Sequence, residues 1–134
     1  MSKHTDNGYM LIFRGTDWFK NLLPRELEQV TEQWRDWFTR LKSEGLALAG
    51  NPLEPEGKIV SGKNGRVVVD GPFAESKEAI GGYFLLNVGT MDEAVAIAQQ
   101  CPGLPHGIRV EVRAVAPEFP VAEELRTEAG VAAH

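Results

Sequence analysis

The segment from residue 70 to residue 78 carries the side chains best suited to acid–base chemistry. Asp70 and Glu75 supply two carboxylates, and Lys77 supplies an ammonium group close by in the chain. A carboxylate in an apolar cleft has a raised pKa and can take a proton from a small acidic carbon. A neighbouring ammonium group can hold the anion that results. If the chain is an enzyme, we therefore expect Asp70, Glu75 and Lys77 to be its catalytic residues.

Arg14, at the end of a predicted strand, is the first candidate for binding a substrate. Its planar guanidinium group can bind a substrate carboxylate by donating two parallel hydrogen bonds to it. A structural role is the alternative, namely a salt bridge to Asp70 or Glu75. Phe73 and Glu78 belong to the same acidic segment. We expect both of them to line the same cleft as substrate-binding residues.

Aromatic side chains recur on one predicted helix, where Trp34, Trp37 and Phe38 lie close together in the chain. Aromatic faces offer a large apolar area at fixed geometry, so these rings can form a wall for a flat ligand. The same helical spacing also predicts ordinary core packing. We include Trp34 among the substrate-binding residues and leave both interpretations open.

The acidic segment also has a purely structural interpretation. Asp70 followed by Gly71 favours a turn, Pro72 fixes its own backbone angle, and Phe73 can anchor the loop. This interpretation needs no ligand. A turn and a binding site therefore remain alternatives for these residues.

Cys101 and His106 could suggest a metal pair, or a nucleophile with its base. No third ligand accompanies them, and Pro102 and Pro105 between them favour a connecting loop. The glycines of residues 62–82 form neither a dinucleotide-binding fingerprint nor a phosphate-binding loop. We expect no metal and no cofactor.

Periodicity predicts the elements that position these residues. Residues 9–14 are apolar except at their end, Arg14, and are bounded by glycines, which indicates a buried strand. An amphipathic helix follows, with Pro24 in its first turn and Gly45 after its end. Thr90 and Glu93 form a capping box that begins a second helix, which we expect to end near Cys101. The remaining predicted strands are residues 58–61 and 66–69, which form a hairpin around Asn-Gly, residues 83–88, and residues 108–115.

This order predicts one α+β domain of the ferredoxin-like (βαββαβ) type with an elaborated β-hairpin. Residues 51–57 are expected to be a loop. Two helices would cover one face of the sheet, and a second copy of the chain would cover the other, so we expect a homodimer. We expect the domain to span residues 1–117, and residues 118–134 to form a mobile or loosely docked tail.

Composition limits the classes of function. The chain has 134 residues, 43% of them hydrophobic and 25% charged, with one cysteine. A single thiol and the lack of a long apolar run indicate a cytoplasmic protein with no membrane segment. The net charge of −5, without a cluster of basic residues, argues against binding to nucleic acid.

The run Asp-Gly-Pro-Phe-Ala-Glu-Ser-Lys-Glu at residues 70–78, followed by Gly-Gly-Tyr at 81–83, resembles the YCII-related superfamily in its DGPF-containing branch. The resemblance extends from residues 10–12 through 60–63 to 110–113. It implies a dimeric α/β-barrel built of ferredoxin-like subunits.

The resemblance implies little about chemistry. Some relatives are linked to sigma factors of the extracytoplasmic-function type, and a few act as lyases that eliminate halide from aromatic substrates. Others carry a His and Asp pair in a cleft. The histidine of that pair aligns with Trp34, and the first helix of this chain contains no histidine. A His–Asp mechanism is therefore not carried over.

Together these observations predict a small-molecule-binding domain. It could be a cofactor-free lyase or isomerase that uses an acidic residue in a cleft near the dimer seam. The alternative is a noncatalytic regulatory or partner-binding module, linked to sigma-factor control through a transcription-factor partner.

Overall fold

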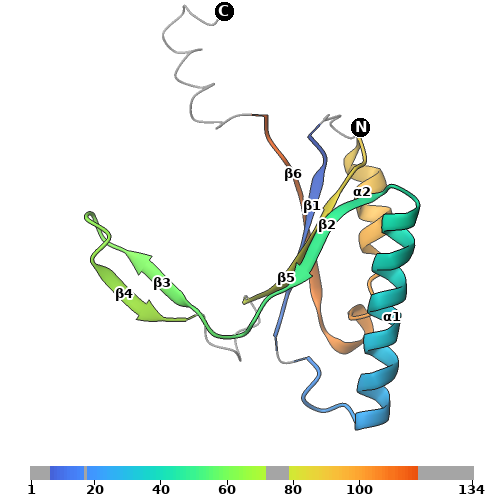
Figure 1. Ribbon diagram of the computed structural model, residues 1–134, viewed down its shortest axis with the longest axis horizontal. Helices are drawn as coiled ribbons and strands as arrows, with labels where there is room; N and C mark the ends of the chain where they lie inside the picture. Colours follow the sequence, from blue (N-terminus) through green and yellow to red (C-terminus); the bar gives the residue numbers. More distant parts are fainter. Residues whose placement is uncertain (1–6, 17, 72–78, 118–134) are drawn as a thin grey trace, which may run out of the picture.

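The computed structural model describes residues 7–16, 18–71 and 79–117. Within these ranges the chain forms a four-stranded antiparallel sheet with two helices packed on one face, and a separate two-stranded hairpin on the other side (Figure 1). This α+β arrangement is compatible with the ferredoxin-like plan expected from the sequence. Neither helix of the described part is both long enough and apolar enough to cross a bilayer.

The strand β1 (Tyr9–Arg14) lies in the middle of the sheet, whose strand order is β2-β5-β1-β6. It pairs with β5 (Ile80–Leu86) on one side and with β6 (Arg109–Ala114) on the other. Side chains of β1 are alternately buried and half-buried, as expected for a strand with one covered face. The strands predicted at 9–14, 83–88 and 108–115 are therefore confirmed, with small shifts at their ends.

The two helices begin where the sequence predicts. In α1 (Pro24–Ser43) the backbone N–H of Leu23 donates to the Glu26 side chain, and Gly45 follows the helix with a φ of +75°. In α2 (Met91–Ala98) the predicted capping box is confirmed, because Thr90 and Glu93 bond each other's backbone N–H groups. The second helix ends at Ala98, before the expected Cys101, and a 3₁₀ turn η1 (Leu104–His106) leads into β6.

One strand was not expected from the sequence. This strand is β2 (Ala47–Pro52), which follows α1 in the chain, pairs with β5 and overlaps the predicted loop at 51–57. Its alanines, glycine and proline have weak strand propensity, so the strand depends on its pairing with β5 and not on its own sequence. Pro52 is tolerated because β2 is an edge strand.

The predicted hairpin is confirmed, but it lies outside the main sheet. It consists of β3 (Lys58–Ser61) and β4 (Val67–Asp70), which pair only with each other. Figure 1 shows it projecting from the side of the sheet that the helices leave open. Its five large apolar side chains are 46 to 61% exposed: Ile59, Val60, Val67, Val68 and Val69.

The core lies between the sheet and the helices. The strands contribute Tyr9, Leu11 and Leu86, which are fully buried there. Helix α1 contributes Trp37 and Leu41 to the same layer. Each large aliphatic or aromatic side chain buried in this way stabilises the fold by about 1.5–3 kcal/mol. The opposite sheet face carries half-buried apolar residues of β1 and β5 at Met10, Ile12, Tyr83 and Leu85.

Candidate functional site

A cavity of about 640 Å³ lies between the first part of α1, the sheet, and the loop that joins β1 to α1. Six of its lining residues are aromatic: Phe13, Trp18, Phe19, Trp34, Phe38 and Phe84. Leu27, Leu53 and Ile108 add aliphatic surface. The interior is therefore suited to a flat apolar molecule.

The aromatic rings hold one another in place through edge-to-face and tilted contacts. Phe13 on β1 lies 4.9 Å, centroid to centroid, from both Trp34 on α1 and Phe84 on β5. Phe38 packs on Phe84 at 4.7 Å. Such pairs are worth about 0.5–1.5 kcal/mol beyond their buried area. Trp34 thus packs against the core and also forms part of the cavity wall, so its two predicted roles are compatible.

Glycines of the neighbouring strands form part of the cavity wall. A β-carbon at Gly50 would lie 2.5 Å from a ring carbon of Phe84 and 2.9 Å from one of Phe38. A β-carbon at Gly82 would lie 3.0 Å from the carbonyl oxygen of Asn51. The absence of side chains here lets the rings lie directly against the backbone of β2 and lets β2 approach β5 closely.

Few polar side chains line the cavity. Within the described residues these are Thr16, Thr31, Arg35 and Asn51, with no carboxylate, histidine or cysteine among them. Arg35 is the only charged residue in this lining. The sequence pattern did not point to it, because it lies off the apolar stripe of α1 and is exposed.

The indole of Trp34 has an unusual feature. Its Nε1 is buried and has no hydrogen-bond partner among the described residues, whereas Nε1 of Trp37 donates to Gln100 at 3.1 Å. A buried donor without an acceptor costs about 1–3 kcal/mol. Trp34 is therefore held in place by its ring contacts and not by a hydrogen bond.

Of the three predicted catalytic residues the structure describes only Asp70, which does not line this cavity. Asp70 ends β4, where it pairs with Lys58, and its side chain is 85% exposed. The apolar surroundings expected for a general base at Asp70 are therefore absent, because an isolated two-stranded hairpin leaves its side chains in water. Glu75, Lys77, Phe73 and Glu78 lie outside the described residues.

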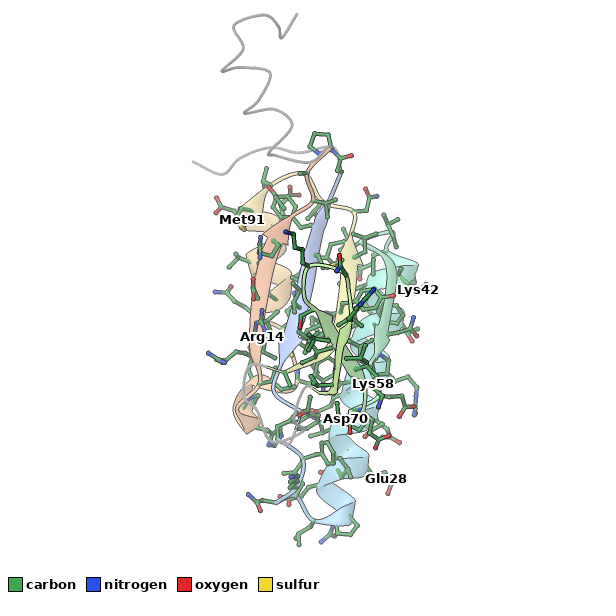
Figure 2. The ribbon with its side chains drawn as sticks, turned by 90° about the vertical axis from the view of Figure 1, so that its left-hand side faces the viewer. Arg14, Glu28, Lys42, Lys58, Asp70 and Met91 are labelled. Carbon is green, nitrogen blue, oxygen red and sulfur yellow. The ribbon has the colours of Figure 1, made fainter. Side chains whose placement is uncertain are left out.

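Arg14 does not line the cavity either. Its Nε and Nη2 each lie 2.8 Å from Oε1 of Glu111, so the predicted ion pair exists with a different partner from Asp70 or Glu75. Figure 2 shows Arg14 on the open face of the sheet. Hydrogen bonds from Arg14, then from Arg113, hold the pKa of Glu111 below its ordinary value.

Cys101 and His106 do not form a site together. Burial raises the pKa of the Cys101 thiol to about 11, against the opposing effect of backbone N–H groups of Gly103 and Leu104. A thiol of this kind is protonated and unreactive at neutral pH. His106 instead stacks on Trp18, with ring centroids 5.9 Å apart. No group of three or more metal-binding side chains occurs in the described ranges.

Comparison with protein families identifies the family of the chain. The model of the YCII-related domain matches residues 9–118, which is most of the chain. The chain belongs to the YCII-related family. The match covers all the strands and both helices of this YCII-related domain, and therefore the whole cavity. A search among curated proteins found no significant match.

Proposed function

We propose that this YCII-related domain binds a small, flat, largely apolar organic molecule in the cavity between α1 and the sheet. The observation that carries the proposal is a cavity of about 640 Å³ with six aromatic residues in its wall. Ligand sites of proteins are typically concave, roughly 300–1,000 Å³ in volume, and mostly apolar with a few polar groups. The cavity fits each of these criteria.

Binding is favoured over catalysis by the chemistry of the lining. No described residue of the cavity wall carries a group that takes up a proton at neutral pH. A cofactor-free lyase or isomerase would need a base from elsewhere, such as Glu75 assisted by Lys77. That mechanism is the narrower form of the proposal, and a Glu75→Gln variant with unchanged turnover would exclude it.

A blocked cavity tests the binding proposal. Thr31 lines the cavity from the exposed side of α1, and Thr39 lies on the same helix away from it. The variant that blocks the cavity is Thr31→Phe, and its matched control is Thr39→Phe. We expect flat phenols, aromatic acids and amides, or halogenated aromatics to raise the melting temperature of the parent and of the control. In Thr31→Phe the added ring occupies the site, so the same compounds should give no shift. A ligand that binds only the folded state stabilises it by mass action.

Two outcomes of this screen would contradict the proposal. One is that no compound stabilises the parent. The other is that Thr31→Phe retains the full shift, which would place the bound compound outside the cavity.

A second function, contact with another protein, is favoured by the exposed apolar hairpin. A lone two-stranded hairpin is marginally stable in water, and five large apolar side chains of this one are exposed. We propose a second copy of the chain as the first partner, covering the hairpin and the open sheet face in a dimeric barrel. Sedimentation equilibrium showing only monomers would exclude it and leave a regulatory partner, such as a transcription factor, as the alternative.

A further inference from the structure

Arg35 is placed to select the ligand of the cavity. It is exposed, it lines the cavity, and no described carboxylate lies within ion-pair distance of its guanidinium. Arg40 on the same helix is different, because it bonds Gln100 at 2.6 Å and lies 3.9 Å from Glu44. The positive charge of Arg35 therefore remains available to a molecule in the cavity.

The neighbouring polar group on α1 cannot take over this role. Thr31 lies one helical turn before Arg35, and its hydroxyl donates its hydrogen to the carbonyl oxygen of Leu27 at 2.8 Å. A hydroxyl has a single hydrogen to donate, so Thr31 has none left for an anion. Among the described lining residues, Arg35 is therefore the only side chain that offers a positive charge to an anionic group.

The apolar interior and the single cation define complementary parts of a ligand. A charge buried among the aromatic rings would lose its hydration without compensation, whereas a charge beside Arg35 stays partly in water. A carboxylate there can accept two parallel hydrogen bonds from the planar guanidinium. The ligand therefore combines a flat apolar body with one acidic group at its end.

We propose that the cavity selects flat aromatic monocarboxylates, with Arg35 binding the carboxylate and the aromatic rings holding the body. This inference rests on the proposed binding function and names its ligand class. The net charge of the chain is −5, so the overall field of the protein repels anions. A preference for an anionic ligand must therefore arise locally.

Two probes of the same shape test the inference. 2-Naphthoate carries a negative charge, and 2-naphthamide has the same ring system without it. We expect calorimetry at low ionic strength to show naphthoate binding about threefold to tenfold more tightly than naphthamide to the parent. Added salt should reduce the difference, because Arg35 is exposed.

The variants Arg35→Gln and Arg25→Gln separate a local from a general effect of charge. Both remove one positive charge from an exposed position of α1, but Arg25 does not line the cavity. We expect the preference for naphthoate to disappear in Arg35→Gln and to persist in Arg25→Gln, while naphthamide binds both variants like the parent.

The outcomes distinguish the two levels of the proposal. If naphthamide binds the parent as tightly as naphthoate, or Arg35→Gln keeps the preference, the assignment of Arg35 is wrong while the binding function stands. If neither probe binds, the cavity does not accept a flat aromatic body of this size and the inference fails, whereas the binding function fails only if no compound of the thermal-shift screen stabilises the parent.

Discussion

At the scale of single residues, two tryptophans of α1 differ in what their indole N–H groups contact. The N–H of Trp37 donates to Gln100, while that of Trp34 is buried without a partner in the described part of the chain. The two rings lie 5.6 Å apart and share the same aromatic cluster. Their substitutions by phenylalanine therefore differ mainly in the hydrogen bond.

We expect Trp37→Phe to lower the free energy of unfolding by about 1 kcal/mol more than Trp34→Phe. Both variants lose similar ring volume, but only Trp37→Phe loses a hydrogen bond, and Trp34→Phe removes an unsatisfied donor. Urea denaturation followed by circular dichroism measures the difference. An equal or larger loss in Trp34→Phe would show that its N–H has a partner in solution.

The candidate site was only partly predictable from residue types. Trp34 could be identified because aromatic residues at helical spacing mark a buried or ligand-facing stripe. Arg35 could not, because its position on the helix indicates solvent, and its place in the cavity lining depends on tertiary structure that no local pattern encodes. The exposure of Asp70 could not be predicted, because it depends on where the hairpin projects, which no local pattern encodes.

At the scale of elements, strong periodicity predicted β1, α1, α2 and β6, because each buries one face against the same core. β2 was missed because its sequence lacks alternation and the strand is stabilised by tertiary pairing. Asn-Gly predicted the hairpin but not its separation from the main sheet, because a turn sequence specifies only the local connection between two strands.

The pairing of β1 with β6 carries an ion pair with a testable pH dependence. The pKa of Glu111 is lowered by Arg14 and Arg113, so its charged form stabilises the folded state. This stabilisation is present at neutral pH and is lost as the pH falls through the lowered pKa. We expect Glu111→Gln to be less stable than the parent at pH 7, and the gap to close below about pH 4.

The control is Glu28→Gln on α1, which removes one exposed carboxylate and none of the ion pairs described here. Its difference from the parent should be small at both pH values. Urea midpoints measured from pH 3 to pH 7 test the prediction. A gap for Glu111→Gln that does not change with pH would mean that the ion pair does not contribute to stability.

At the scale of the whole molecule, the helical side and the open side of the sheet have different roles. The helical side contains the aromatic cavity, and the open side carries the Arg14–Glu111 pair, half-buried apolar residues and the exposed hairpin. We propose ligand binding on the helical side and contact with a second copy on the open side. A dimer could therefore form without covering the cavity.

The most direct test of ligand binding uses the indole N–H signals of the three tryptophans in a ¹⁵N-labelled sample. Trp18 and Trp34 line the cavity, whereas Trp37 does not and serves as an internal reference. Titration with neutral 2-naphthamide should shift the signals of Trp18 and Trp34 in a saturable way and that of Trp37 much less. Unchanged signals for Trp18 and Trp34 at saturating probe would contradict the account.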